Sequence, residues 1–295
     1  MSDFLQPRSL AQALEERAAH LEYQLLAGGT DLLVASKDRL PLLGMIDLMS
    51  VSELSGIEEV AGGGLRIGAT TSYSKILDSE AIATRFALLH KACREIGAAQ
   101  IQARGTLGGN IATSSPVGDS LPALMALDAQ LELASTRGKR TVPYREFLRG
   151  YRKVDMAEDE LIVAILLPAQ PEGAFHYWRK VGTRRAQSIS KLMIAAVGSV
   201  QDGKIASAKI SLGAVADRTI RLYEVEKAIV GQKPGPETAA IAKEVVRASI
   251  TPIDDLRSNA EYRLSTAENL VARFVLGLAS TVGTTQSPSS AKKNK

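Results

Sequence analysis

Two glycine pairs, each followed by short polar side chains, are the residues of this sequence best suited to hold a phosphorylated ligand. The first lies in the run AGGTD at residues 27–31, and the second in TLGGN at residues 106–110. Glycine adopts positive φ readily and lets a backbone approach a ligand closely because it has no Cβ. Successive main-chain N–H groups in such turns form a concavity that suits phosphate oxygens. The two runs therefore predict loops that hold a diphosphate from both sides.

A glycine pair by itself is also compatible with an ordinary tight turn that binds nothing. Neither run matches the patterns G-x-G-x-x-G or G-x-x-x-x-G-K-[ST], so the sequence supports neither a standard dinucleotide fingerprint nor a P-loop. The second run continues through the hydroxyl residues Thr113, Ser114 and Ser115 to Asp119, and then becomes apolar with helical spacing. We expect a loop that leads to a short buried helix.

Composition argues against several classes of protein. The chain has 295 residues, of which 45% are hydrophobic and 23% charged, with a formal net charge of +4, which is ordinary for a globular protein. Basic residues cluster at 179–191 and at the end of the chain, and we interpret them as solvated surface rather than a nucleic-acid site. Aromatic residues make up 4% of the chain, too few for a platform that stacks single-stranded bases.

Metal centres are not expected within this polypeptide. An iron–sulfur cluster needs four cysteines, or two cysteines and two histidines. The chain has one cysteine, Cys93, and three histidines, His20, His90 and His176, without ligand spacing. Cys93 lies in an apolar-periodic stretch and is expected in the core, whereas His20 and His90 are expected on helix surfaces.

The compartment follows from what the sequence lacks. One cysteine excludes an intramolecular disulfide framework and fits a reducing environment. The N-terminal residues MSDFLQPRSL do not have the pattern of a signal peptide. No apolar run approaches the length of about 18 residues that a membrane span requires. We therefore predict a cytoplasmic protein.

Periodicity and turn residues predict the order of the secondary structure. Residues 9–20 form an amphipathic helix with Ser9 as its N-cap, followed by a short strand at 23–27 and a β-leaning segment to Asp47. The remaining predicted elements are a hairpin around Gly62–Gly64, a helix to Leu77 capped by Thr71 or Ser72, a helix at 80–96, strands at 129–135 and 160–167 with a short helix at 144–148 between them, a strand at 174–181, a hairpin at 190–214 with its turn at Asp202-Gly203, and helices at 219–229, 237–248 and 260–278.

Four motifs, in this order, resemble the FAD-binding subunit of the molybdenum hydroxylases. They are AGGTD at 27–31, TLGGNIATSSPVGDSLP at 106–122, KVGTRR at 180–185 and DDLRSNAEYR at 254–263, and the resemblance covers roughly residues 1–280. The family includes the medium subunit of carbon monoxide dehydrogenase and the flavin domain of xanthine dehydrogenase. Its members tend to carry AGGHS where they oxidise carbon monoxide, so Asp31 makes that substrate less expected here.

The resemblance implies an α+β protein. It would have a two-subdomain FAD-binding fold of the vanillyl-alcohol oxidase or PCMH type, followed by a C-terminal α/β domain with a small antiparallel sheet. We place the first FAD-binding subdomain at residues 1–55, the second at 56–172, the C-terminal domain at 173–283 and a disordered tail at 284–295.

The resemblance also implies FAD as the cofactor and assigns residues to it. One side of the pyrophosphate would be held by Leu25, Leu26, Ala27, Gly28, Gly29, Thr30, Asp31 and Leu32. The other side would be held by Thr106, Leu107, Gly108, Gly109 and Asn110.

Four further residues are assigned to the flavin pocket, each with a structural alternative. Asp119 would accept a hydrogen bond from the FAD, or would cap a helix; Ile96 and Ile162 would line the pocket, or belong to the core. Lys180 would stabilise negative charge on the reduced isoalloxazine, or would be a solvated charge. For residues 254–257 we prefer a helix cap with a salt-bridging arginine over a ligand site.

Partners follow from the resemblance as well. In the family, a large subunit with a molybdenum cofactor oxidises the substrate with water, and a small subunit with two [2Fe–2S] clusters carries the electrons to FAD. The FAD reduces NAD, a quinone or a cytochrome, and the heterotrimers often form an (αβγ)2 assembly. Two alternatives stay open: a stand-alone flavoprotein oxidoreductase, which without His or Cys in either run would bind its flavin non-covalently, and a non-catalytic nucleotide-binding assembly protein.

Overall fold

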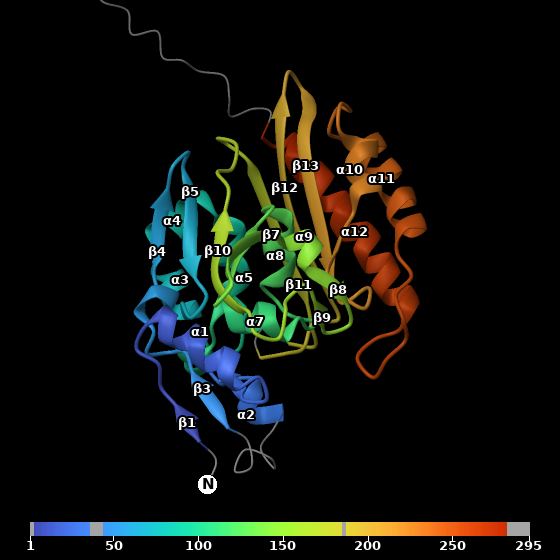
Figure 1. Ribbon diagram of the computed structural model, residues 1–295. Coiled ribbons are helices and arrows are strands. Elements are labelled where there is room, and N and C mark those ends of the chain that lie inside the picture. Colours follow the sequence, from blue (N-terminus) through green and yellow to red (C-terminus); the bar gives the residue numbers. More distant parts are fainter. Residues whose placement is uncertain (1–2, 36–43, 185–186, 282–295) are drawn as a thin grey trace, which may run out of the picture.

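A computed structural model describes residues 3–35, 44–184 and 187–281 of the chain (Figure 1). The predicted disordered tail at 284–295 and Arg185 of the KVGTRR motif lie outside these residues. Buried side chains form three clusters, one in the N-terminal unit, one around a central five-stranded sheet and one in the C-terminal part. Helices and sheets occur throughout, as the expected α+β class requires. No helix among the described residues is long and apolar enough to cross a membrane.

The N-terminal unit is a parallel three-stranded sheet with one helix. Its strands are β1 (Phe4–Leu5), β2 (Gln24–Leu26) and β3 (Met45–Asp47), in the order β1-β3-β2, and its helix is α1 (Leu10–Ala19). The predicted cap of α1 is confirmed, because Ser9 Oγ accepts a hydrogen bond of 3.2 Å from the Gln12 amide. His20 ends α1 and stacks on Tyr23 with ring centroids 4.5 Å apart.

The predicted β-leaning segment from Leu32 to Asp47 is wrong at its start. Residues Leu32–Ala35 form the short helix α2, and the part of the segment that the structure describes is extended at β3. The amide of Leu33 donates to the carbonyl oxygen of Gly29, which has a φ of +73°, so the chain turns back on itself directly after the glycine pair. Local turn geometry thus overrides the β preference of the apolar side chains.

The central sheet is antiparallel, in the order β4-β5-β10-β6-β7. Its strands are β4 (Ile57–Val60), β5 (Gly64–Gly68), β6 (Gln130–Ser135), β7 (Gly138–Pro143) and β10 (Leu161–Leu167). The predicted hairpin at Gly62–Gly64 is confirmed, with Gly62 and Gly63 at φ values of +81° and +83°. β10 is buried on both faces: Leu161 and Val163 pack toward the N-terminal unit, and Ile165 toward the central cluster.

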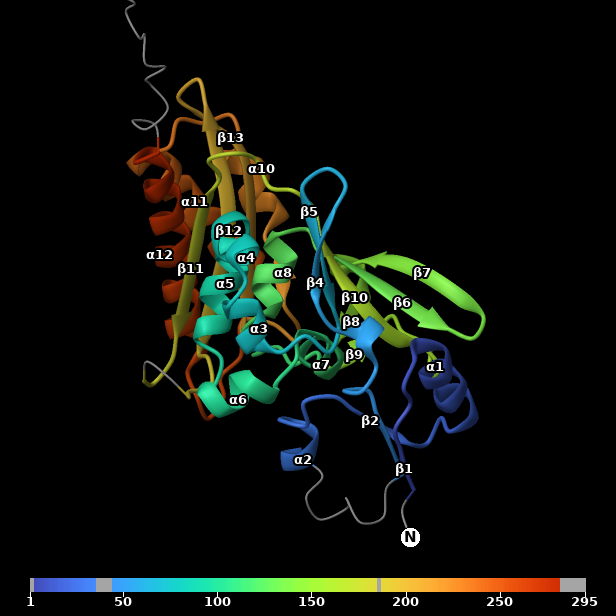
Figure 2. The ribbon, with the colours of Figure 1, turned by 90° about the vertical axis from the view of Figure 1, so that its left-hand side faces the viewer.

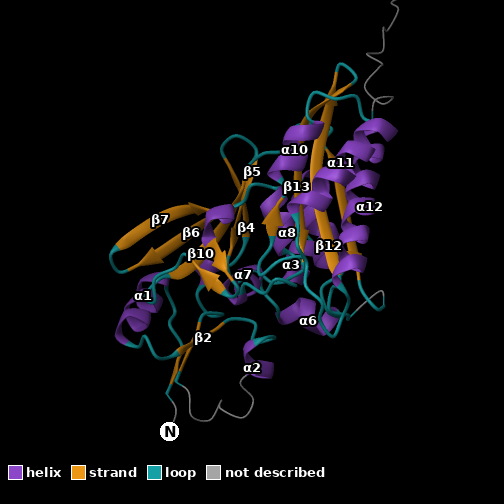
Figure 3. Cartoon of the chain, turned by 90° about the vertical axis from the view of Figure 1, so that its right-hand side faces the viewer, coloured by secondary structure: helices purple, strands orange, loops and turns teal. Residues whose placement is uncertain are grey.

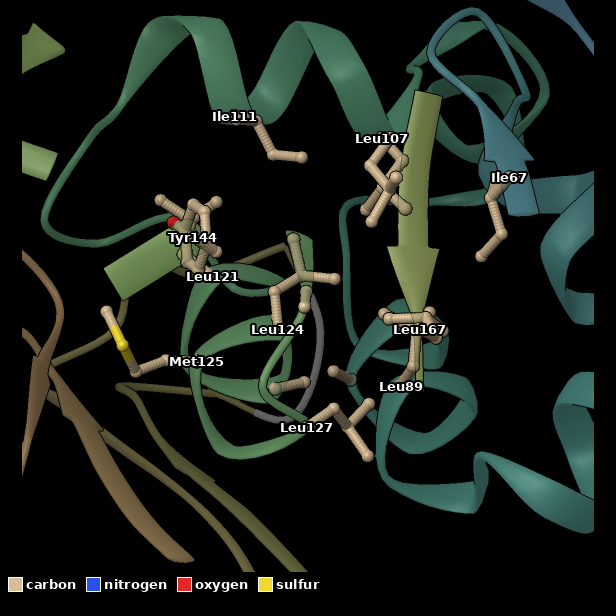
Figure 4. Close-up of a cluster of buried hydrophobic side chains, with 14 of the residues drawn as sticks. Ile67, Leu89, Leu107, Ile111, Leu121, Leu124, Met125, Leu127, Tyr144 and Leu167 are labelled. Atoms are coloured by element: carbon tan, nitrogen blue, oxygen red, sulfur yellow. The ribbon is translucent and has the colours of Figure 1, made fainter. Parts of the chain in front are cut away.

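Short helices and one small hairpin surround this sheet. The helical elements are η2 (Ser52–Leu54, a 3₁₀ helix), α3 (Tyr73–Leu77), α4 (Glu80–Arg85), α5 (Ala87–Arg94), α6 (Ala99–Arg104), α7 (Leu107–Thr113), α8 (Leu121–Ala126) and α9 (Tyr144–Phe147). The hairpin is made of β8 (Leu148–Gly150) and β9 (Lys153–Val154). Figure 4 shows how side chains of α7, α8 and the sheet meet, with Leu107, Leu124 and Leu167 among them.

Three expectations for this region meet different outcomes. Ser72 caps α3, accepting from the Lys75 amide at 3.3 Å, as predicted. The helical pattern expected at 80–96 forms two helices, α4 and α5, because buried Phe86 interrupts it with φ and ψ of −125° and 44°. Cys93 is fully buried in the central cluster, which confirms it as a core residue, and His90 is half-buried, with Nε2 3.2 Å from the carbonyl oxygen of Leu77.

The C-terminal part is an antiparallel sheet covered by helices. Its strands, in the order β11-β12-β13-β14, are β11 (Phe175–Val181), β12 (Leu192–Gln201), β13 (Lys204–Gly213) and β14 (Ile220–Arg221). Helices α10 (Tyr223–Ile229), α11 (Pro236–Ser249) and α12 (Ala260–Ala279) lie on its outer side, as Figure 3 shows. Figure 2 shows α5 and α8 on the inner side, so this sheet also packs against the central part.

The secondary structure predicted for the C-terminal part is confirmed except at the start of one helix. The Asp202-Gly203 turn has φ values of +52° and +72°, as a tight two-residue hairpin needs. The helix expected from residue 219 begins at Tyr223 instead, because residues 220–221 form the edge strand β14. Asp254 accepts from the Ala260 amide at 2.6 Å, so the preferred helix-cap interpretation holds.

Two arginines pair with the carboxylate of Asp255 at that cap. The expected Arg257 lies 3.9 Å from it, and the buried guanidinium of Arg263, which was not predicted, lies 2.7 Å from it. The N-cap of α12 itself is Asn259, which accepts from the Tyr262 amide.

Candidate functional site

A cavity of about 540 Å³ separates the N-terminal unit from the segment around α6 and α7. Most of the predicted site residues line it: Leu25, Ala27, Gly28, Gly29, Thr30, Asp31, Leu32, Ile96, Thr106, Gly109, Asn110 and Asp119. Five others are not among the lining residues: Leu26, Leu107, Gly108, Ile162 and Lys180. The two glycine runs, some 80 residues apart in sequence, therefore face one space.

Gly28 is where the two halves of the site touch. An ideal Cβ at this residue would lie 1.8 Å from the carbonyl oxygen of Arg104, at the end of α6. Any side chain would push the first run away from the second. A second link is polar, because Thr113 Oγ1 donates to Asp31 Oδ2 at 3.3 Å. The contact thus requires glycine at position 28.

Residues 28–31 present unused hydrogen-bond donors to the cavity. None of their four amide N–H groups donates to an acceptor among the residues that the structure describes. Gly29, at a φ of +73°, gives the turn the left-handed residue that makes neighbouring N–H groups converge. Donors of this kind are costly to leave without a partner when water is excluded. The first run is therefore suited to an anion.

The second run differs from the expected loop. Its residues begin the helix α7, capped by Thr106 Oγ1, which accepts from the Gly109 amide at 3.2 Å. The amides of Leu107 and Gly108 donate to the carbonyl oxygens of Thr71 and Ala69, at 3.2 and 2.9 Å. The Asn110 amide donates to Thr106 O at 3.1 Å, so the amide donors of residues 107–110 are already used.

Packing, rather than ligand contact, explains the glycine at position 108. An ideal Cβ there would lie 2.6 Å from both the Cβ and the carbonyl oxygen of Ala69, just after β5. Leu107 and Ile111 of the same helix point into the core in Figure 4, and both are fully buried. The helix is thus seated on the central sheet, with its opposite side, including Gly109 and Asn110, at the cavity.

Asp119 joins the cavity to the C-terminal sheet. Its carboxylate lies 2.7 Å from Lys180 Nζ and accepts a 2.8 Å bond from Ser190 Oγ. Burial raises the pKa of the Asp119 carboxyl, and the Lys180 ammonium and Ser190 hydroxyl oppose that shift. Ser120, not Asp119, occupies the N-cap position of α8, so the helix-cap alternative is wrong.

Lys180 is not a solvated charge. Its side chain is 4% exposed, and Nζ also donates to the carbonyl oxygen of Glu95 at 3.3 Å. It lies behind Asp119 rather than on the cavity wall. Any electrostatic effect of Lys180 on a ligand would therefore be exerted together with the Asp119 carboxylate.

The two isoleucines assigned to the pocket, Ile96 and Ile162, lie in different places. Ile96 lines the cavity, whereas Ile162 lies in β10 within the central cluster, 8% exposed. The sequence analysis missed other lining residues: Tyr73, Ile101, Ala112, Val117, Gly118 and Arg152. Tyr73 and Arg152 come from α3 and from the β8–β9 turn, and no local motif marks either.

The chemistry of the lining fits a bound dinucleotide better than catalysis by side chains. The described residues of the wall include neither His nor Cys, so they offer no histidyl or cysteinyl attachment site for a flavin. Tyr73 lines the wall, and its hydroxyl is buried. Free amides, a buried hydroxyl and apolar patches are what a pocket for a large phosphorylated cofactor needs.

Comparisons with known proteins agree with this geometry. The family model described as "FAD binding domain in molybdopterin dehydrogenase" matches residues 1–170, and "CO dehydrogenase flavoprotein C-terminal domain" matches residues 177–278. The chain is 30% identical to the nicotine 6-hydroxylase medium subunit of Paenarthrobacter nicotinovorans, over 92% of this chain and 95% of that one. It is 30% identical to the xanthine dehydrogenase FAD-binding subunit of Escherichia coli O157:H7, over 90% and 92% of the two chains.

Solved structures show the same fold. A chain of the Cu,Mo-CO dehydrogenase in its cyanide-inactivated form superposes with a TM-score of 0.89 at 30% identity, covering 95% of this chain and 98% of that one. A chain of quinoline 2-oxidoreductase from Pseudomonas putida 86 gives a TM-score of 0.87 at 27% identity, covering 95% and 97%.

Proposed function

We propose, on the premise that this chain belongs to the FAD-binding family of the molybdopterin dehydrogenases, that it relays electrons from the [2Fe–2S] clusters of a partner subunit through FAD to a separate acceptor. FAD supplies the redox chemistry, since it can take up and return electrons one or two at a time. The polypeptide binds the cofactor, sets its orientation and provides the charges around it. Its own side chains carry out no bond-breaking step.

The observation that carries the proposal is the set of free amides at residues 28–31. These residues line a cavity that also has glycine at the point of closest approach between its walls. The proposed role of these amides is to hold the FAD diphosphate. Leu25, Ala27 and Leu32 would flank it, and Leu26 would support them from behind.

The second run has a different proposed role. Its amides are occupied, so Thr106, Gly109 and Asn110 would form the opposing wall through shape and side-chain polarity. Leu107 and Gly108 would fix that wall to the sheet, and Ile162 would support it from the core. Ile96 would contact the ring system directly.

Asp119 and Lys180 are proposed to lie at the flavin end. The pair is neutral overall and buried beside the cavity. The Lys180 ammonium would lower the energy of a negatively charged reduced flavin. It would also neutralise the charge of the Asp119 carboxylate. Removal of the cation would leave the carboxylate to repel that charge.

The proposed partners are a small [2Fe–2S] subunit and a large molybdopterin subunit, assembled as (αβγ)2 in the cytoplasm. The single cysteine of this chain cannot ligate an iron–sulfur cluster alone, so electrons have to arrive from another polypeptide. The proposed acceptor is NAD, a quinone or a cytochrome. Substrate contacts would lie in the large subunit.

The test is to tag this chain at its own locus, purify it, and measure flavin, iron and molybdenum. We expect acid-released FAD together with iron and molybdenum in fixed proportion, and electron paramagnetic resonance signals of [2Fe–2S] clusters. Flavin without either metal, through successive purifications, would favour the stand-alone flavoprotein instead. Protein that carries neither flavin nor metal would contradict the proposal.

A further inference from the structure

The cavity wall carries one cation among its described residues. The charged side chains on the wall are those of Asp31, Asp119 and Arg152. Asp119 is neutralised by Lys180, and Asp31 is an acid that would repel an anion. The diphosphate of FAD is dianionic. Arg152 is the positively charged side chain on this wall that can offset the charge of the diphosphate.

Arg152 occupies an unusual backbone conformation. It lies in the turn between β8 and β9 with a φ of +51°, in the left-handed region that non-glycine residues seldom adopt. A strained backbone conformation persists only where the surrounding structure or the function of the residue requires it. Such residues are found most often at ligand and active sites. Glycine would adopt this turn more easily, but it would bring no charge.

Neighbouring arginines have ionic partners, whereas Arg152 has none among the described residues. Arg149 pairs with Asp155 at 3.2 Å, and Arg140 pairs with Asp155 at 3.0 Å and with Glu160 at 2.6 Å. Arg152 forms no hydrogen bond or ion pair within the described part of the chain. A free guanidinium on the wall of a cavity is available to a ligand.

We propose that Arg152 is the cationic contact of the FAD diphosphate. Its planar guanidinium can donate two parallel hydrogen bonds to phosphate oxygens, beside the amide donors of residues 28–31, which line the same cavity. The inference rests on the proposed FAD site and extends it with a residue from the β8–β9 turn, outside both glycine runs.

The experiment compares Arg152→Gln and Arg149→Gln in the full chain. Arg149 is the matched control, since it lies on the same hairpin but pairs with Asp155 and does not line the cavity. Flavin-stripped proteins are titrated with FAD, ADP and riboflavin. We expect Arg152→Gln to weaken FAD and ADP roughly tenfold and to leave riboflavin unchanged, because riboflavin has no phosphate. Arg149→Gln leaves all three affinities unchanged.

A second variant separates binding from folding. Arg152→Gly relieves the strained turn, so it raises the melting temperature without ligand while it weakens FAD and ADP as Arg152→Gln does. A purely structural arginine would not give these opposite changes. Added KCl weakens FAD binding more in the wild type than in either variant. Salt screens the ion pair between Arg152 and the diphosphate, and the variants do not form this pair.

Three results would overturn the inference. FAD affinity equal to wild type in Arg152→Gln shows that the guanidinium does not contact the diphosphate. An equal loss for riboflavin shows a general change in the cavity instead of a phosphate contact. Wild-type protein that binds no FAD contradicts the proposed site itself, and this outcome is distinct because it does not depend on any variant.

Discussion

Gly28 is the residue at which the geometry of the site is least tolerant. A Cβ at this position would lie 1.8 Å from the carbonyl oxygen of Arg104, and that oxygen belongs to the backbone, which cannot rotate away. We expect Gly28→Ala to separate the first run from α6, to lower the affinity for FAD at least a hundredfold, and to destabilise the fold by about 1–3 kcal/mol. FAD titration and thermal unfolding measure the two effects.

Gly235→Ala is the matched control for that substitution. Gly235 has an extended backbone with a φ of 170°, and nothing lies within 4 Å of the position of its Cβ. This variant should bind FAD like the wild type. If Gly28→Ala also bound FAD normally, the close approach of the two walls would not matter for the site.

At the residue scale, the sequence predicted the composition of the site better than its hydrogen bonding. Both glycine runs and Asp119 could be placed at one site because their order resembles a known family. The use of the amides could not be predicted, because it depends on the carbonyl groups of Ala69 and Thr71, which precede the run by more than thirty residues. Arg152 was missed because nothing in the local sequence marks it.

At the element scale, β11 is joined to the segment before α8 by the buried pair of Lys180 and Asp119. Lys180→Met would leave a carboxylate in a poorly solvated place with only Ser190 as a partner. We expect a loss of about 3 kcal/mol in the free energy of unfolding, and a more negative reduction potential of the bound flavin. Denaturant unfolding and potentiometric titration measure them.

The double variant Lys180→Met with Asp119→Asn is the control for charge. It removes both ions, so much of the lost stability should return, as it does when a buried pair is replaced entirely. An unchanged potential in Lys180→Met would argue against any influence of this pair on the flavin.

A second link between elements is sensitive to pH. His176 of β11 accepts a hydrogen bond from the Leu88 amide of α5 through Nδ1, at 3.1 Å. Burial, with a smaller effect of Lys91, lowers the pKa of His176 to about 4. The unfolded chain, with an ordinary histidine pKa near 6.5, binds this proton first, so stability is fully present above about pH 6.5 and declines toward pH 4.

The prediction is a pH-dependent loss of up to roughly 3 kcal/mol, because each unit of pKa shift corresponds to about 1.4 kcal/mol. His176→Asn should flatten this part of the stability curve, since an asparagine amide does not titrate. The measurement is urea unfolding at intervals between pH 4 and pH 7. A curve of the same slope in both proteins would show that another group is responsible.

Helices and strands could be predicted where residues close in sequence determine them, and could not be predicted where packing against distant residues determines them. Hairpins at residues 57–68 and 192–213 were predicted because alternating apolar residues flank glycine-containing turns. The helix α7 was predicted as a loop because its glycines suggested flexibility, whereas the Thr106 cap and packing on the sheet stabilise it. The break at Phe86 was invisible because burial of one aromatic ring, not a proline or glycine, interrupts the helix.

At the scale of the whole molecule, three clusters of buried residues position one cavity. The N-terminal unit brings the free amides, the central part brings α7, and the C-terminal part contributes Lys180 of β11 and Ser190, which precedes β12, as partners of Asp119. The family and fold could be predicted because four motifs occur in a fixed order along the chain. The substrate and acceptor could not, because the groups that would select them belong to other polypeptides. The predicted domain bounds stay a prediction.

The account depends most on the amides of residues 28–31, and nuclear magnetic resonance observes them one by one. The flavin-stripped chain, labelled with ¹⁵N and ²H, is titrated with ADP, which carries the same diphosphate as FAD. New hydrogen bonds to phosphate should move the amide protons of residues 28–31 downfield, by more than those of Gly108 and Gly109, whose donors are already bonded. Binding that shifts Gly108 and Gly109 and leaves residues 28–31 in place would contradict the account.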